Sequence, residues 1–290
     1  MNNKTIGSRI FQIFNYTIMI LLCISTVYPF LHILSLSLSP QSVPLTKLYI
    51  IPPEVTFQNF AQVIKNEYIA SGFSNTIFRT AVGTVLSLIF TILGAYPLSK
   101  RYFPHRSFWT GMVVFTMFFS AGLVPNYLWM KQLGLKDSRW VLILPYLASA
   151  YNLVIARNFF MGLPESVEES ARIDGASDWY ILYKIVIPMS MPIVATLFLW
   201  IAVMHWNSWF DSMLYLTDAK DQVLQVVMRR IVLEGTMSVN DLNDPNAQSY
   251  ASPETLKAAT IIVTTVPILV VYPFIQKHFV KGVMVGSIKG

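Results

Sequence analysis

Apolar stretches long enough to cross a membrane dominate this sequence. A helix needs about 20 predominantly apolar residues to span the hydrocarbon core of a bilayer. The chain has 290 residues, of which 54% are hydrophobic and 12% charged, whereas soluble domains carry about 25% charged residues. A water-soluble core could not hide so much apolar surface. We therefore predict an all-α integral membrane protein, a single membrane domain over residues 1–290 with six transmembrane helices at about 11–38, 73–98, 108–130, 140–160, 189–214 and 258–275.

Two basic features of these stretches need interpretation. Lys4 and Arg9 precede the first stretch, as in a secretory signal. That stretch is too long for a signal core and no small-x-small cleavage site follows it, so we expect an uncleaved helix.

Arg79 is the one basic residue near the interior of a predicted span. Because it lies close to the start of the second helix, we expect its side chain to extend back to the interface and to have no part in transport.

The net charge of +6 raises the question of nucleic-acid binding. The basic residues instead form short runs at the ends of apolar stretches, which is typical of anchoring at an anionic membrane surface. The lipid bilayer is therefore the expected partner, and nucleic acid is not. Lys100-Arg101 and the basic tail over residues 276–290 favour a multi-pass protein with both termini in the cytoplasm.

The segment over residues 161–188 differs from the other connections because its sequence predicts helix. Pro164 suits the first turn of a helix, and the glutamates that follow suit the positive end of its dipole. Gly175 interrupts the helix, and Ser177 or Asp178 can cap a second, short one. We predict a helix–turn–helix on the cytoplasmic face between the fourth and fifth spans.

This segment resembles the Glu-Ala-Ala (EAA) loop of ATP-binding-cassette (ABC) importer permeases, in which Glu-Ala-Ala, Gly and Ile-x-Leu-Pro follow at fixed spacing. Here the same spacing gives Glu169-Ser170-Ala171, Gly175 and residues 185–188, with Ser170 in place of alanine and Ile187 in place of leucine. The resemblance implies a coupling helix that docks on a cytoplasmic ATPase. The alternative is an ordinary interfacial helix. The implied coupling residues are Glu169, Ser170, Ala171, Asp174, Gly175, Ile185 and Pro188.

The resemblance extends over nearly the whole chain, towards the carbohydrate branch that includes the maltose-type second permease. Residues 95–104 are similar to that branch's conserved pattern at the inner end of the second span, and residues 285–290 to its C-terminal pattern. In that branch the tail reaches the ATPase dimer, which implies contacts from Gly286, Ser287 and Lys289. Without the resemblance, a basic and glycine-rich tail is usually frayed.

Polar and aromatic residues gather near the end of the fifth span, and this cluster resembles permeases for oligo- and polysaccharides. Aromatic rings stack on sugar rings, while amides and carboxylates match hydroxyl groups. Polar groups inside a span are costly, which favours a function for them. The alternative is an aromatic belt at the outer interface. The expected substrate-pathway residues are Trp206, Asn207, Trp209 and Asp211.

The motifs of an enzyme are missing from the sequence. No Gly-x-x-x-x-Gly-Lys-Ser/Thr, His-Glu-x-x-His or Gly-x-Ser-x-Gly occurs, and the single cysteine, Cys23, excludes a cysteine-based metal site. We expect no catalytic residue, no metal and no cofactor on this chain.

The resemblance implies a permease subunit in a bacterial cytoplasmic (inner) membrane, forming half of the path for an oligosaccharide or polysaccharide fragment. Its implied partners are a second homologous permease, an ATPase dimer that holds ATP and Mg, and an extracytoplasmic sugar-binding protein. The alternative is a self-sufficient secondary transporter or channel, which would show internal repeats and buried coupling carboxylates.

Overall fold

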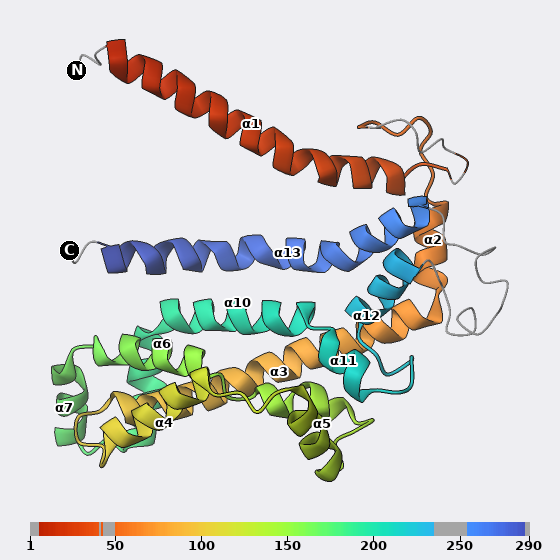
Figure 1. Cartoon of the computed structure of the whole chain (residues 1–290). Helices are drawn as coiled ribbons and strands as arrows, with labels where there is room; N and C mark the ends of the chain where they lie inside the picture. Colours follow the sequence, from red (N-terminus) through yellow and green to blue (C-terminus); the bar gives the residue numbers. More distant parts are fainter. Residues whose placement is uncertain (1–5, 41, 43–49, 235–253, 288–290) are drawn as a thin grey trace. The chain divides into compact units, whose positions relative to one another are not determined.

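The computed structural model describes residues 6–40, 42, 50–234 and 254–287, with Ile6, Glu234 and 271–287 as backbone only. Within these ranges the chain is almost entirely helical and contains no strand, as the sequence predicts (Figure 1). The elements are α1 Ile6–Ser37, α2 Gln58–Lys65, α3 Glu67–Ser99, α4 Arg106–Phe118, α5 Leu123–Gln132, η1 Arg139–Leu142, η2 Leu144–Tyr146, α6 Ala150–Met161, α7 Glu165–Ile173, α8 Asp178–Ile181, η3 Leu182–Val186, α9 Ile187–Met189, α10 Met191–Asn207, α11 Phe210–Tyr215, α12 Leu224–Arg229, η4 Arg230–Glu234 and α13 Glu254–Ser287.

The chain forms two compact units. The first comprises residues 1–69 and 228–266, and the second residues 70–227 and 267–290. In the first unit, the buried Asn59 of α2 donates from its amide to the carbonyls of Ser37 (3.0 Å) and Ser39 (2.8 Å), and so satisfies the end of α1. Its amide oxygen accepts from Thr255 at the start of α13 (3.4 Å). The short helix α2 thus connects the end of α1 to the start of α13.

Two helices of the described chain are individually long and apolar enough to cross a membrane, namely Gly7–Ser37 and Glu67–Ser99. Three further helix pairs reach that length and apolarity only together, and each pair is bent where its two helices meet. The bends are 113° between α4 and α5, 45° between η1–η2 and α6, and 83° between the α8–α9 run and α10. By length and composition these elements provide up to five spans.

The bends show where the uninterrupted helices predicted over 108–130, 140–160 and 189–214 differ from the structure. Gly122 has φ +88° between α4 and α5, a conformation that favours glycine. Ser149 starts α6 by accepting a hydrogen bond from the backbone of Asn152 (3.4 Å). Pro188 and Pro192, on either side of Ser190, lack the N–H groups that would continue the helical ladder. The run over 189–214 breaks again after Asn207, before α11 begins.

Two apolar clusters form the core of the second unit. One joins the C-terminal half of α3 to α6, α8, η3 and α10, with the buried side chains Ile92, Ala95, Tyr96, Ala156, Phe160, Ile181, Leu182, Val186 and Leu197. The other joins η1 to α11 and α12, with Val141, Leu142, Tyr215, Leu216, Val223 and Val226. The first cluster packs against the predicted coupling residues Ala171 and Ile185, and the second packs against the predicted pathway residue Trp209.

Two glycines of α3 let neighbouring side chains approach its backbone. A Cβ on Gly83 would lie 2.7 Å from Nε2 of His205, whose ring is fully buried. A Cβ on Gly94 would lie 2.9 Å from Cδ1 of Leu153, the end of a flexible side chain. The imidazole ring has far less freedom to move than this methyl group, so of these two glycines Gly83 is the one that packing requires.

We expect Gly83→Ala to lower the free energy of unfolding by about 1–3 kcal/mol, because the buried His205 ring must be displaced. Gly94→Ala is the matched control, since Leu153 can change rotamer and alanine favours a helix. The thermal stability of both variants, purified in detergent, measures the difference. Equal stabilities would show that the His205 ring is not fixed.

Candidate functional site

Helix α7 is built as the sequence predicts. It begins directly after Pro164, with Glu165 and Glu168 in its first turn and Arg172 in its last, each at the end of the helix dipole that attracts its charge. Gly175 follows with φ +83°. Ser177 then starts α8 by accepting a hydrogen bond from the backbone N–H of Tyr180. The predicted helix–turn–helix is thus present.

The end of α7 is a Schellman turn. The N–H of Gly175 donates to the carbonyl of Arg172 (3.0 Å), and the N–H of Ala176 donates to that of Ala171 (2.9 Å). This pattern requires a left-handed residue at the position of Gly175. Ala171 and Ala176 are half-buried and pack against the core cluster of α6, α8 and α10. Small residues therefore hold α7 close to that core.

The opposite face of α7 is open. Glu169, Ser170 and Asp174 are exposed, and Ile173 has 86% of its surface exposed. On α8 and η3, Trp179 and Tyr183 are also exposed. An apolar side chain as exposed as Ile173, on a segment with two further exposed aromatic side chains, is typical of a surface that binds another protein.

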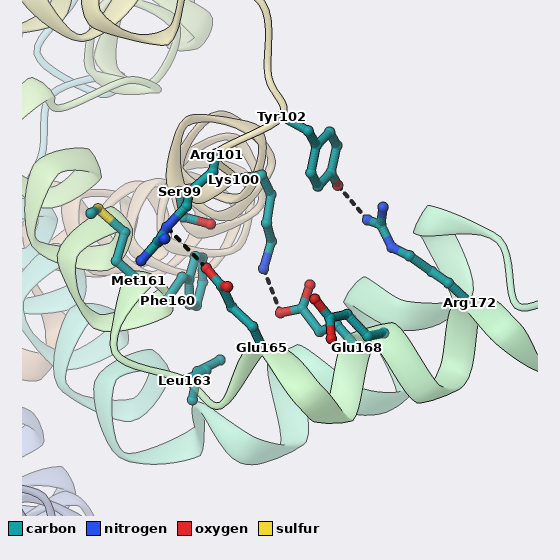
Figure 2. A pocket seen from close by; sticks show the side chains of 11 residues that line it. Ser99, Lys100, Arg101, Tyr102, Phe160, Met161, Leu163, Glu165, Glu168 and Arg172 are labelled. Carbon is teal, nitrogen blue, oxygen red and sulfur yellow. Dashed lines mark hydrogen bonds and ion pairs between the residues drawn. The ribbon is translucent and has the colours of Figure 1, made fainter.

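The inner face of α7 contacts the three residues that follow α3, one after another (Figure 2). The Nζ of Lys100 donates to Oε1 of Glu168, and Arg101 pairs with Glu165 (3.3 Å). The guanidinium of Arg172 donates to the hydroxyl of Tyr102 and lies 4.5 Å from its ring centroid. These residues line a cavity of ≈ 240 Å³ between α3 and α7.

The contacts of Lys100 and Arg101 differ in burial. The side chains of Lys100 and Glu168 are 11% and 10% exposed, whereas those of Arg101 and Glu165 are 84% and 64% exposed. An exposed pair contributes about 0–1 kcal/mol. Breaking a buried pair costs more, because the remaining charge loses its partner. Lys100 also lies 4.7 Å from the ring centroid of Tyr96. We call the Lys100–Glu168 pair the inner latch.

Arg172 remains charged in this arrangement. Its hydrogen bond to the Tyr102 hydroxyl, the largest influence on it, raises the pKa of the guanidinium above its ordinary value. It also donates to Asp178 of α8 (2.7 Å). Arg172 therefore connects the end of α3, α7 and α8.

The predicted coupling residues fall on two sides of this segment. Glu169, Ser170, Asp174 and Gly175 lie on the open side, while Ala171 and Ile185 pack inward. Pro188 is exposed next to the bend that precedes α10. Of the predicted tail residues, Gly286 and Ser287 belong to the backbone of α13, and Lys289 lies outside the described residues.

The four predicted pathway residues are not brought together into one cluster. Asn207 is exposed, and its amide donates to the carbonyl of Val203 (3.0 Å). Trp206 contacts the ring of Phe73 edge-on, with the ring centroids 6.0 Å apart, and lines an apolar cavity of ≈ 790 Å³. Trp209 packs beside the cluster of η1, α11 and α12.

Asp211 is buried, and it shows that the prediction for Arg79 is wrong. Arg79 has no exposed surface and does not reach an interface. Both of its terminal nitrogens donate to the carboxylate of Asp211, and one also donates to the carbonyl of Ser208 (3.1 Å). The guanidinium lies 5.8 Å from the ring centroid of Tyr146. The only acid predicted within a span neutralises the only base near a span interior, which is why neither extends outward.

The signals for this pair were present in the sequence. A charged residue in an apolar span usually has a partner in the protein interior, and Asp211 was the one available acid. The inner latch was harder to predict, because Lys100 has the position of an ordinary stop signal and Glu168 suits the helix dipole without any tertiary partner.

We expect Asp211→Ala to lower the free energy of unfolding by about 3–5 kcal/mol, because it leaves the Arg79 charge buried without its partner. The double variant Arg79→Met with Asp211→Leu should recover most of this loss. Asp221→Ala is the control, since its pair with Arg139 is exposed and contributes about 0–1 kcal/mol. Thermal unfolding in detergent would contradict the assignment if Asp211→Ala were as stable as Asp221→Ala.

Known proteins resemble this chain over most of its length. Residues 106–285 match the family of binding-protein-dependent transport system inner membrane components. A polygalacturonan/rhamnogalacturonan transport system permease protein of Bacillus subtilis is 39% identical over 98% of this chain and 99% of its own. A trehalose transport system permease protein of Mycobacterium tuberculosis is 30% identical over 90% of this chain and 92% of its own.

Solved structures show the same fold. A chain of a bacterial ABC transporter involved in the import of the acidic polysaccharide alginate has a TM-score of 0.89 and 32% identity, covering 96% of this chain and 100% of that one. A chain from a second alginate transporter structure, with a TM-score of 0.61 and 15% identity over 93% of this chain and 95% of its own, shares the fold. The chain therefore belongs to the family of inner membrane components of binding-protein-dependent transport systems.

Proposed function

We propose that this chain is the permease subunit of an ABC importer and forms half of the translocation path for an oligosaccharide or polysaccharide fragment. The observation that carries the proposal is α7 with its Schellman turn at Gly175. It presents an open face with Glu169 and Ile173 while its inner face is held to α3. A rigid projection of this kind, in a chain of this family, suits docking on a separate ATPase.

The remaining subunits follow from this role. A second homologous permease completes the path, an ATPase dimer holds ATP and Mg, and an extracytoplasmic sugar-binding protein delivers the substrate. ATP binding closes the ATPase dimer and moves α7, so that two states of the permease are biased from both sides of the membrane. The proposed contacts of the C-terminal tail with the ATPase dimer come from Gly286, Ser287 and Lys289.

Six spans fit the observed helices. The two long helices and the three bent pairs provide five, and α13, with 34 residues, provides the sixth. In this proposal α7 lies between the fourth and fifth spans, on the cytoplasmic side with both termini. The basic residues Lys100 and Arg101 at the end of α3 support this orientation in the cytoplasmic membrane.

The substrate class rests on the relatives and on the end of α10. Relatives named for polygalacturonan/rhamnogalacturonan and alginate transport favour a fragment of a polysaccharide. Asn207, Trp206 and Trp209 provide an amide and aromatic rings that suit a sugar. Asp211 contributes by holding the break between α10 and α11, because its carboxylate is bound by Arg79.

Affinity co-purification of the tagged chain from its native membrane tests the assembly. Recovery of an ATPase subunit and a second permease would support the proposal. Uptake that depends on ATP, measured with the recovered complex, would support it further. A stable complex of this chain alone, with uptake that persists without an ATPase, would favour a secondary transporter or channel.

We expect Gly175→Pro to leave the protein inserted but to separate ATP hydrolysis from uptake. Proline cannot adopt φ +83° and removes the N–H that donates to Arg172, so the end of α7 must rearrange. Uptake per ATP hydrolysed, in reconstituted vesicles, is the measurement.

Gly134→Pro is the matched control for backbone damage. Gly134 has φ +70° and closes the same kind of Schellman turn at the end of α5. We expect this variant to keep the coupling ratio of the unmodified protein. If both variants uncoupled ATP hydrolysis from uptake equally, the effect would not be specific to α7, and its proposed role in coupling would be contradicted.

A further inference from the structure

Helix α3 is bound near both of its ends to segments with different proposed tasks. It is a continuous helix from Glu67 to Ser99. The distance along its axis from Arg79 to Ser99 is about 30 Å, at 1.5 Å per residue. Near its inner end lies α7, and near its outer end lies the segment over 205–224, which contains the end of α10.

The contacts of the outer end are polar and lie on one side of α3. The amide of Asn75 donates to the carbonyls of Lys220 (2.8 Å) and Gln222 (3.1 Å). The backbone N–H of Leu224 donates to the hydroxyl of Thr76 (2.9 Å). One turn further along the helix, Arg79 binds Asp211 and the carbonyl of Ser208 at the break between α10 and α11.

The inner end is bound by the latch. Lys100 directly follows α3, and its partner Glu168 lies in the middle of α7 with 7% of its surface exposed. The end of α3 is also tied to α6, since Nε of Arg157 donates to the carbonyl of Leu98 (2.9 Å). Any displacement of α7 must therefore either move the end of α3 or break a shielded ion pair.

The covalent route from α7 to α10 is less direct. It passes the glycine turn at Gly175, the π-helical turn η3 and the 83° bend at Ser190. Each of these interrupts the regular helical hydrogen-bond ladder. The route along α3 follows one helix, from Arg79, about a third of the way along it, to Lys100, with a single proline, Pro97, in its last turn.

We propose that α3 transmits the movement of α7 to the break between α10 and α11, through the inner latch Lys100–Glu168 at one end and Arg79–Asp211 at the other. Lys100 and Glu168 are then positioning residues for transport and do not touch the substrate. This inference rests on the proposed function, because it takes α7 as the element that the ATPase moves.

The test uses the complete transporter in vesicles, with Cys23→Ser and with Met213→Cys as a reporter at an exposed position of α11. The rate of thiol labelling at the reporter is measured with and without ATP, alongside uptake per ATP hydrolysed. The variants are Lys100→Glu, Glu168→Lys and the double swap. Arg101→Glu is the matched control, because the ion pair that Arg101 forms with Glu165 is exposed and is not part of the inner latch.

We expect each single latch variant to reduce uptake per ATP about 5-fold or more and to abolish the ATP-dependent change in labelling. The double swap should restore both, and Arg101→Glu should resemble the unmodified transporter. An ATP-dependent labelling change that persists in Lys100→Glu would overturn the inference and favour the covalent route through η3. If the unmodified transporter shows no ATP-dependent uptake, the proposed function fails instead.

Discussion

The pairing of Arg79 with Asp211 is the constraint on which the second unit depends. A charge buried among apolar helices is tolerated only with a partner and further hydrogen bonds. Here that requirement fixes where the break between α10 and α11 lies relative to α3, because Arg79 binds both the carboxylate of Asp211 and the carbonyl of Ser208. His205 then packs against Gly83 one turn along the same helix. The irregular backbone after Asn207 is therefore held in place by a side chain from another helix.

Much of α7 and its surroundings could be predicted because the relevant signals are local. Pro164 and Gly175 mark the two ends of the helix through their backbone preferences alone, and the structure has it at Glu165–Ile173. The apolar stretches likewise indicated helices. Helix α3 begins at Glu67, six residues before the apolar span predicted over 73–98, because its first turns are less apolar than the span. Asn66, whose side-chain oxygen accepts from the N–H groups of Tyr68 and Ile69, was an available capping signal.

What could not be predicted depends on tertiary structure. The apolar character of residues 108–130 indicates a span but not the 113° bend between α4 and α5, and Gly122 alone gives neither the direction nor the size of that bend. The partners Lys100 and Glu168 are 68 positions apart, and Arg79 and Asp211 are 132 apart. One sequence offers no measure of such distances, and each latch residue had an adequate local explanation. Locally satisfied residues are therefore the ones whose long-range role is easiest to miss.

The exposure of Ile173 has a consequence for the life of the subunit before assembly. Together with Trp179 and Tyr183 it presents apolar surface next to α7, and large exposed patches of this kind favour aggregation or recognition by other proteins. A permease made in excess of its ATPase would leave this surface in contact with water. If α7 docks on the ATPase as proposed, this surface is covered in the assembled transporter and exposed in the unassembled subunit, so its accessibility distinguishes the two.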